Sequence, residues 1–225
     1  MEAVAQKTSV YFEEFNSRPQ AGSQWCADLQ RKGIEAFEQL GFPGPREEAW
    51  RKTNLRPVTD THFRLAEGRG AAPQGLVARL NEVGDCYRLT FVDGRFVADL
   101  SDLTSLPSGL TVTPFSEYKA QAPDRLVSAL GSRANVESHP FVALNTAFFV
   151  DGAYVHVARG ARIEKPVAIN HIITPDANGQ AVYPRLVVEA EEDTEVRIIE
   201  RFIGDDEITT LVCPVSELSA AAASI

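Results

Sequence analysis

Short runs rich in β-branched residues follow one another after residue 139. They are YVHV, VAINHII, RLVVEA, TEVRIIERFI and ITTLV, at residues 154–157, 167–173, 185–190, 194–203 and 208–212. Turn residues bound each run, and no helical pattern of useful length separates one run from the next, which predicts a succession of short β-strands. Such a chain can fold as a sandwich, a barrel or a solenoid whose coils each contribute parallel strands.

The segment VHVARGARIEKPVAI favours the solenoid. Gly160 and Pro166 stand where corners would fall, and the apolar residues around them are spaced like inward-facing side chains on consecutive faces of a β-helix. Those residues are Val155, Val157, Ile163, Val167 and Ile169. We therefore expect an all-β right-handed parallel β-helix over residues 139–225. Because the closing SELSAAAASI has neither a charged rim nor a capping helix, we expect a truncated solenoid with only the first coils of a β-helix core.

Residues 1–138 are expected to form an α+β N-terminal region that begins with helices. Apolar residues at intervals of three to five predict a helix between the N-cap candidate Ser23 and Gly41, and a shorter helix over residues 10–15. The segment REEAWRKTNL, at residues 46–55, has acids in its first turn and bases in its last, which predicts a third short helix.

The second half of this region is expected to mix strands and a helix. Alternation of apolar and polar residues predicts antiparallel strands in residues 76–80 and 86–100, and Asp93–Gly94 supplies a tight hairpin turn. LTVTPF predicts a further strand at residues 110–115, and residues 123–130 a helix. The glycine-rich segment at residues 68–75 reads as a flexible loop and a weak boundary.

Composition excludes several classes of protein. The chain has 22 Lys and Arg against 31 Asp and Glu, a net charge of −9, so its overall field does not favour nucleic acid. No stretch approaches the roughly 18 consecutive apolar residues of a membrane span, and the first residues lack the pattern of a signal or transit peptide. Three cysteines far apart indicate reduced thiols. We expect a cytoplasmic protein.

The residues that could carry chemistry are few. The sequence contains no GxxxxGK[ST], GxGxxG, GxSxG or HExxH motif. His156 and His171 lie in neighbouring runs and, with Glu164, could hold a metal ion, but two surface histidines are the simpler interpretation. Cys213 precedes Pro214 and could bind iron or sulfur, but core packing is favoured for it and for Cys26 and Cys86.

Two acidic groups and an aromatic pair also have simple interpretations. The acidic residues are Glu189, Glu191, Glu192, Asp193, Asp205, Asp206 and Glu207. They invite a calcium site, but carboxylates at β-turns are usually solvated corners. Phe148 and Phe149 are expected to pack in the core at the start of the solenoid. We therefore assign no catalytic, cofactor-binding or metal-binding residue.

Two segments resemble a known family. GFPGPREEAWRKTNL, at residues 41–55, and HPFVALNTAFFVDGAYVHVARGARIEKPVAI, at residues 139–169, are similar in order and spacing to two elements of the SufB/SufD family. That family comprises scaffold proteins of the SUF system for iron–sulfur cluster assembly, and the helical start before the first element is more like SufD than SufB.

The resemblance implies a scaffold subunit, not an enzyme. It would pair with a SufB-like subunit and, at full length, with a SufC-like ATPase through a C-terminal helical domain, or with a second copy of itself through the exposed end of the β-helix. No nucleic acid, no membrane and no cofactor in this part are expected, because the iron–sulfur cluster is handled by the full complex. The family's important cysteine and histidine would lie beyond residue 225. Two alternatives remain, namely a carbohydrate-active or acyltransferase-type β-helix enzyme and a two-domain protein with a sandwich.

Overall fold

The β-branched runs form strands that pair in parallel with the strand one coil later. We call one passage of the chain through the three sheets a coil. The computed structural model describes residues 2–18, 24–44, 47–68, 70–118 and 122–225. The strands after residue 139 are β5 (Ala153–Val157), β6 (Val167–Ile172), β7 (Gln180–Val182), β8 (Arg185–Ala190), β9 (Ile198–Ile203), β10 (Leu211–Val212) and β11 (Val215–Ala220). β5 pairs with β8 and β8 with β11, β6 pairs with β9, and β7 pairs with β10, all in parallel.

Strands from the first part of the chain extend each of these sheets on the opposite side. They are β1 (Arg64–Leu65), β2 (Tyr87–Val92), β3 (Arg95–Phe96) and β4 (Leu110–Pro114). β1 joins β7 and β2 joins β6 in parallel, whereas β4 joins β5 antiparallel. The sheet orders are β1-β7-β10, β11-β8-β5-β4 and β3-β2-β6-β9. Strands from both sides of residue 138 therefore share sheets, and a domain division at that residue stays a prediction.

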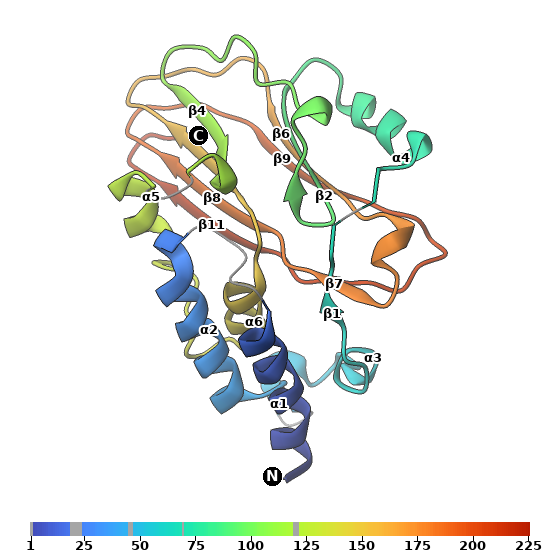
Figure 1. The fold of residues 1–225 in the computed structure, drawn as a ribbon. Helices are drawn as coiled ribbons and strands as arrows, with labels where there is room; N and C mark the ends of the chain where they lie inside the picture. The colour runs from blue at the N-terminus through green and yellow to red at the C-terminus, as the bar shows by residue number, and fades with distance from the viewer. Residues whose placement is uncertain (1, 19–23, 45–46, 69, 119–121) are drawn as a thin grey trace.

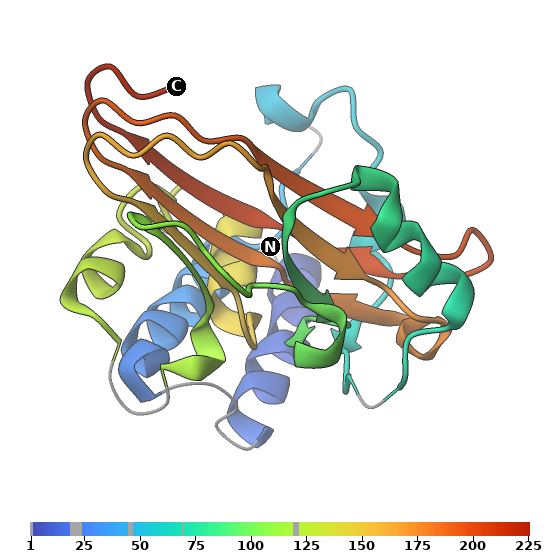
Figure 2. The ribbon, with the colours of Figure 1, turned by 90° about the horizontal axis from the view of Figure 1, so that it is seen from above.

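Seen from above, the coils stack in chain order. In Figure 2 the strands follow one another from green through gold and orange to red, so the last coil lies at the outside of the stack. The interior of the coils is apolar, because alternate residues of each strand point inward. Leu89, Val155, Ile169 and Leu186 lie there, each at most 2% exposed.

Helices pack against the outer face of the coils. They are α1 (Glu2–Ser17), α2 (Ala27–Leu40), which follows a 3₁₀ turn at Gln24–Cys26, and α6 (Pro140–Phe148). Figure 1 shows these three helices side by side below the sheets, where Tyr11, Phe37 and Phe148 form a second core. α2 and α6 are in close contact, since a Cβ on Gly33 would lie 2.7 Å from the backbone nitrogen of Ala147.

Short elements complete the N-terminal region. They are α3 (Arg56–Thr59), α4 (Gln74–Ala78), α5 (Asp124–Ala129) and 3₁₀ turns at Glu48–Trp50, Arg79–Val83, Ala98–Leu100, Phe115–Glu117 and Pro175–Ala177. None of the helices in the described ranges is long and apolar enough to span a membrane.

Several local predictions are confirmed. The hairpin turns at Asp93 and Gly94, both with positive φ, and β4 and α5 form where they were expected. α2 ends before Gly41, whose φ of 68° only glycine adopts easily. The predicted N-cap, Ser23, lies outside the described residues. The short helix predicted over residues 10–15 is part of the longer α1.

Other local predictions are wrong. Residues 76–80 are helical, because Leu76, Val77 and Leu80 form one apolar face of a short helix that packs on the outer face of the sheet. In residues 46–55, only Glu48–Trp50 forms a turn of helix, and residue 46 lies outside the described ranges. Gln74 and Gly75, the last residues of the predicted loop over residues 68–75, belong to α4, and the flexibility of that loop stays a prediction. α6, β7 and β11 were not predicted.

Candidate functional site

The last coil leaves one side of all three sheets unpaired. β9, β10 and β11 are the outermost strands of their sheets, and we call them the open edge. Large apolar side chains are exposed on it, with Phe202 43% and Leu218 61% exposed. Free N–H and C=O groups on a strand edge offer a template for a further strand. The next coil of a solenoid would pair along the same three strands.

A ladder of stacked rings runs through the interior of the coils to the open edge. His171 lies between Phe91 and Phe202, with ring centroids 5.3 and 5.1 Å away. Its Nε2 is 3.2 Å from Glu200 Oε1, and Ser216 Oγ donates to Glu200 Oε2 at 2.8 Å. Burial raises the pKa of Glu200, but His171 and Ser216 outweigh it and leave that pKa below its ordinary value. His171 is thus a buried rung of the stack, not the surface histidine expected.

His156 lies on a different sheet and has a carboxylate partner of its own. Its Nε2 is 3.1 Å from Glu191 Oε1, which also pairs with Arg125 at 2.7 Å. The backbone N–H of Arg159 and the ring of His156 hold the pKa of Glu191 below its ordinary value. The nearby Glu164 offers its carbonyl to Arg197.

The structure does not bring the candidate metal ligands together. Each of the two histidines is committed to a different glutamate. Across the described ranges, no three His, Cys, Asp or Glu side chains gather where they could hold a metal ion. Neither the histidine site nor the calcium site considered from the sequence gains support.

All three cysteines are buried thiols that form no disulfide. Cys213 lies at the corner between β10 and β11, where its thiol is 3.5 Å from the carbonyl of Phe141. Burial raises the pKa of the Cys213 thiol to about 12, so the thiolate that would bind iron or attack sulfur is scarce at neutral pH. Core packing is the role that this geometry supports.

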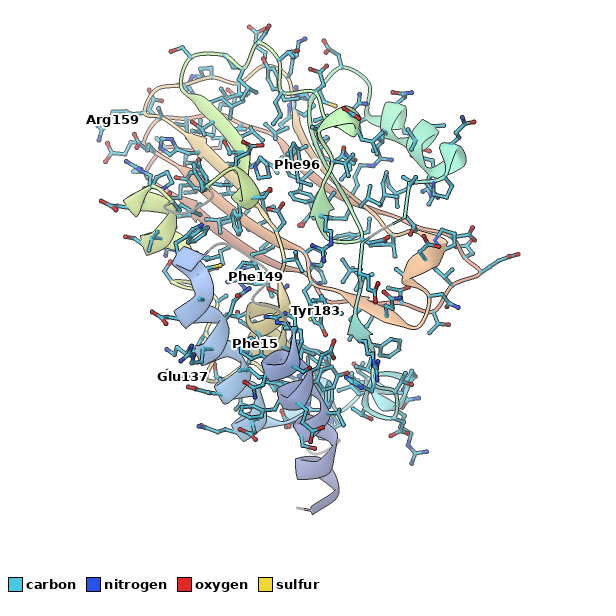
Figure 3. All side chains as sticks on the ribbon, viewed as in Figure 1. Phe15, Phe96, Glu137, Phe149, Arg159 and Tyr183 are labelled. Atoms are coloured by element: carbon cyan, nitrogen blue, oxygen red, sulfur yellow. The ribbon has the colours of Figure 1, made fainter. Side chains whose placement is uncertain are left out.

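The acidic turn between β8 and β9 forms ion pairs with the basic turn between β5 and β6, one coil earlier. Arg159 lies 2.7 Å from Glu192, and Arg162 lies 2.7 Å from Asp193. Arg159 marks this outer corner in Figure 3. The signal was in the sequence, since ARGARIEK is basic and EEDTEVR, one coil later, is acidic. Opposite charges on stacked corners help to keep the two coils in register.

A buried polar network was not anticipated. Arg185 on β8 is fully buried and forms an ion pair with Glu217 on β11. Asn145 on α6 accepts a hydrogen bond from Arg185 at 3.0 Å and donates to the carbonyls of Pro184 and Cys213 at 2.8 and 2.7 Å. Pro184 and Cys213 lie at matching corners of successive coils, so one amide spans the distance between coils. Phe149, next to this network, is buried as expected (Figure 3).

A groove of about 830 Å³ lies between α1 and β1. Its one histidine, His62, is 2.9 Å from Glu14, and the other oxygen of that carboxylate accepts the N–H of Leu65. Within the groove, His62 and Glu14 thus satisfy each other.

The comparisons with known proteins agree on one family. The family description of the SufBD protein N-terminal region matches residues 1–169. An iron–sulfur cluster assembly SufBD family protein of Synechocystis is 27% identical over 179 residues, which are 77% of this chain and 38% of that protein.

Two further relatives carry similar names. The iron–sulfur cluster assembly protein SufD of Escherichia coli is 28% identical over 174 residues, 76% of this chain and 38% of that protein. A chloroplastic iron–sulfur cluster assembly SufBD family protein of Arabidopsis thaliana is 27% identical over 109 residues, 48% of this chain and 19% of that protein. The match thus spans well under half the length of each relative.

Proposed function

This chain belongs to the SufBD family, as its two sequence motifs predicted, and on that premise we propose that it is a non-catalytic scaffold subunit of a SUF-type iron–sulfur cluster assembly complex. The names of the relatives support a role in iron–sulfur cluster assembly, and the match to SufD of Escherichia coli supports a SufD-like subunit. The iron–sulfur cluster is the cargo of the complex. A cytosolic location is part of the proposal, and three buried cysteines outside any disulfide suit a reducing compartment.

The fold that we propose for residues 139–225 is the beginning of a right-handed parallel β-helix. Parallel pairing between successive coils in all three sheets supports it. An apolar interior with charges at the corners supports it as well, because a solenoid buries its core between stacked repeats.

The family match over residues 1–169 is the observation that carries the proposal. The assembly role in the names of the relatives supports the binding of partner subunits. We propose that a SufB-like subunit pairs with this protein, and that a SufC-like ATPase joins the complex when the protein is full length.

Co-purification tests the proposal. We expect the affinity-tagged full-length protein to retain a co-expressed SufB-like subunit and a SufC-like ATPase from the same source. A folded protein that retains no SufB-like subunit would overturn the proposal.

A further inference from the structure

A continuous hollow follows the outer edge of β1, on the side of the sheets away from the open edge. β1 is the outermost strand of the sheet β1-β7-β10, and α1 forms the facing wall (Figure 1). Hollows of about 310, 830 and 290 Å³ adjoin along it, because the first two share Val10 and His62 and the last two share Glu67 and Gln180. We call the whole hollow the β1 groove.

The walls of the β1 groove are shaped for a chain segment. One wall runs along residues 59–68, and the other is a single face of α1, where Val10, Glu13, Glu14 and Ser17 recur at intervals of three and four residues. Because the groove follows the protein chain for the length of a strand, an extended segment fills it better than a compact molecule does.

The charge of the β1 groove is negative. Among the described lining residues, six carboxylates stand against two basic side chains, Arg64 and His62. The carboxylates are those of Glu13, Glu14, Asp60, Glu67, Asp93 and Asp176. Complementary charge selects partners and steers their approach, so the groove fits a cationic ligand.

Glu14 is fixed in place on the helix wall. Its Oε1 accepts the N–H of Leu65 at 2.8 Å, and its Oε2 is 2.9 Å from Nε2 of His62. The next N–H along the strand, that of Ala66, donates to Ala181 of β7, so the N–H of Leu65 is the one that points away from the sheet. Glu14 therefore blocks a further strand at this point, and recognition must come from side chains. A carboxylate with two partners still has lone pairs for an ammonium or guanidinium group.

The far end of the β1 groove brings two carboxylates within reach of each other. Asp93 is 3% exposed and accepts the N–H and the hydroxyl of Thr174 at 2.8 and 2.6 Å. Burial raises the pKa of Asp93 more than the bonds from Thr174 lower it, and the charge of Asp176 raises it further. A cationic side chain bound at this end would relieve that repulsion.

We propose that the β1 groove binds an extended segment of another protein that carries several lysine or arginine side chains. Alternate side chains of an extended segment point the same way, so cations at every second position can reach the carboxylates of one wall. The site is separate from the proposed role in cluster assembly, and a failure here would leave that role standing.

General attraction between a cationic peptide and an acidic chain is the competing explanation. The chain has a net charge of −9, so some attraction is expected at any face. General attraction depends on the number of charges, whereas a groove depends on their place. Variants with the same change in charge at different places therefore separate the two explanations.

Fluorescence anisotropy with defined peptides tests the β1 groove in the full-length protein. The probe is a short labelled peptide of alternating Lys and Ser, and the comparison peptide has Glu in place of Lys. We expect the Lys peptide to bind with an affinity that falls as salt rises, and the Glu peptide not to bind. Glu13→Lys/Asp176→Lys should weaken binding by about tenfold or more, because it reverses one charge on each side of the groove.

The matched control is Glu35→Lys/Glu38→Lys on α2. All four replaced side chains are exposed, so both double variants should fold, and both change the net charge equally. The control should alter the affinity by less than about twofold, since its charges lie outside the groove. Hydrogen exchange with the Lys peptide bound should show protection in residues 62–67. No binding by the folded protein, equal weakening in the two variants, or protection confined to other segments would overturn the proposal.

Discussion

The two ends of the coil stack use the same strand pattern but have different neighbours. At the first end, β1, β3 and β4 are the outermost strands of their sheets, and interior residues such as Leu89 and Val112 are buried. At the last end no described strand covers β9, β10 or β11, and Phe202 and Leu218 are exposed. The two ends thus differ in how far their interior side chains are buried among the described residues.

The ends also differ in how position is fixed. Apolar side chains that alternate along β2 and β6 specify one register at the first end. At the open edge, polar contacts add to the backbone pairing of β11, because Glu217 accepts backbone N–H groups and Ser216 donates to Glu200.

Removal of apolar volume should give the largest difference between the ends. Leu89→Ala should lower the free energy of unfolding by about 2–5 kcal/mol, because it leaves a cavity in a fully packed interior. Leu218→Ala should lower it by less than about 0.5 kcal/mol, because that side chain is exposed. Urea unfolding of both variants measures the difference, and equal losses would remove the distinction between the ends.

Replacement of buried thiols should affect stability, not assembly. Cys26→Ser and Cys86→Ser each place a hydroxyl in a buried site, which should cost about 1–3 kcal/mol in unfolding free energy. Retention of the SufB-like subunit should be unchanged at temperatures where the variants are folded. A folded variant that no longer supports cluster assembly in a reconstituted system would show that the thiol has a chemical role.

Acid should weaken the buried ion pair between Glu217 and Arg185. Burial raises the pKa of Glu217, but Arg185 and the backbone N–H groups of Gly131, Arg133 and Ala134 outweigh it, so the folded-state pKa lies below the ordinary 4.5. A carboxylate with a depressed pKa contributes stability above its unfolded pKa and loses that contribution as pH falls through its folded pKa.

The pH dependence can be isolated with one variant. The difference in unfolding free energy between the unchanged chain and Glu217→Gln should be largest near neutral pH and should shrink as the pH falls below about 4.5. Chemical unfolding at several pH values measures it. A difference that does not vary with pH would mean that the charge of Glu217 does not matter.

The corner ion pairs should give the smallest effect. Arg159→Gln removes an exposed pair with Glu192 and should change the free energy of unfolding by only about 0–1 kcal/mol, less at high salt. Thermal unfolding at two salt concentrations checks this. A larger loss would mean that charge at the corners, more than the apolar interior, holds the coils together.

The sequence predicted the strands better than their surroundings. Val and Ile runs bounded by glycine, proline and acids mark β5, β6 and β8 because strand formation is local. α6 was missed because PFVALNTAF is apolar on every side and shows no helical period. The strand assigned to residues 76–80 failed because five residues fit either period.

The candidate site depended on contacts that a sequence does not display. Glu217 and the loop that binds it are 86 residues apart at Gly131, and backbone N–H groups carry no residue signature. The glutamate partners of His156 and His171 likewise come from the next coil. Only the family resemblance pointed beyond local structure.

Co-purification tests the account most directly. The affinity-tagged full-length protein should retain a SufB-like subunit and a SufC-like ATPase. A folded protein that retains neither would contradict the account.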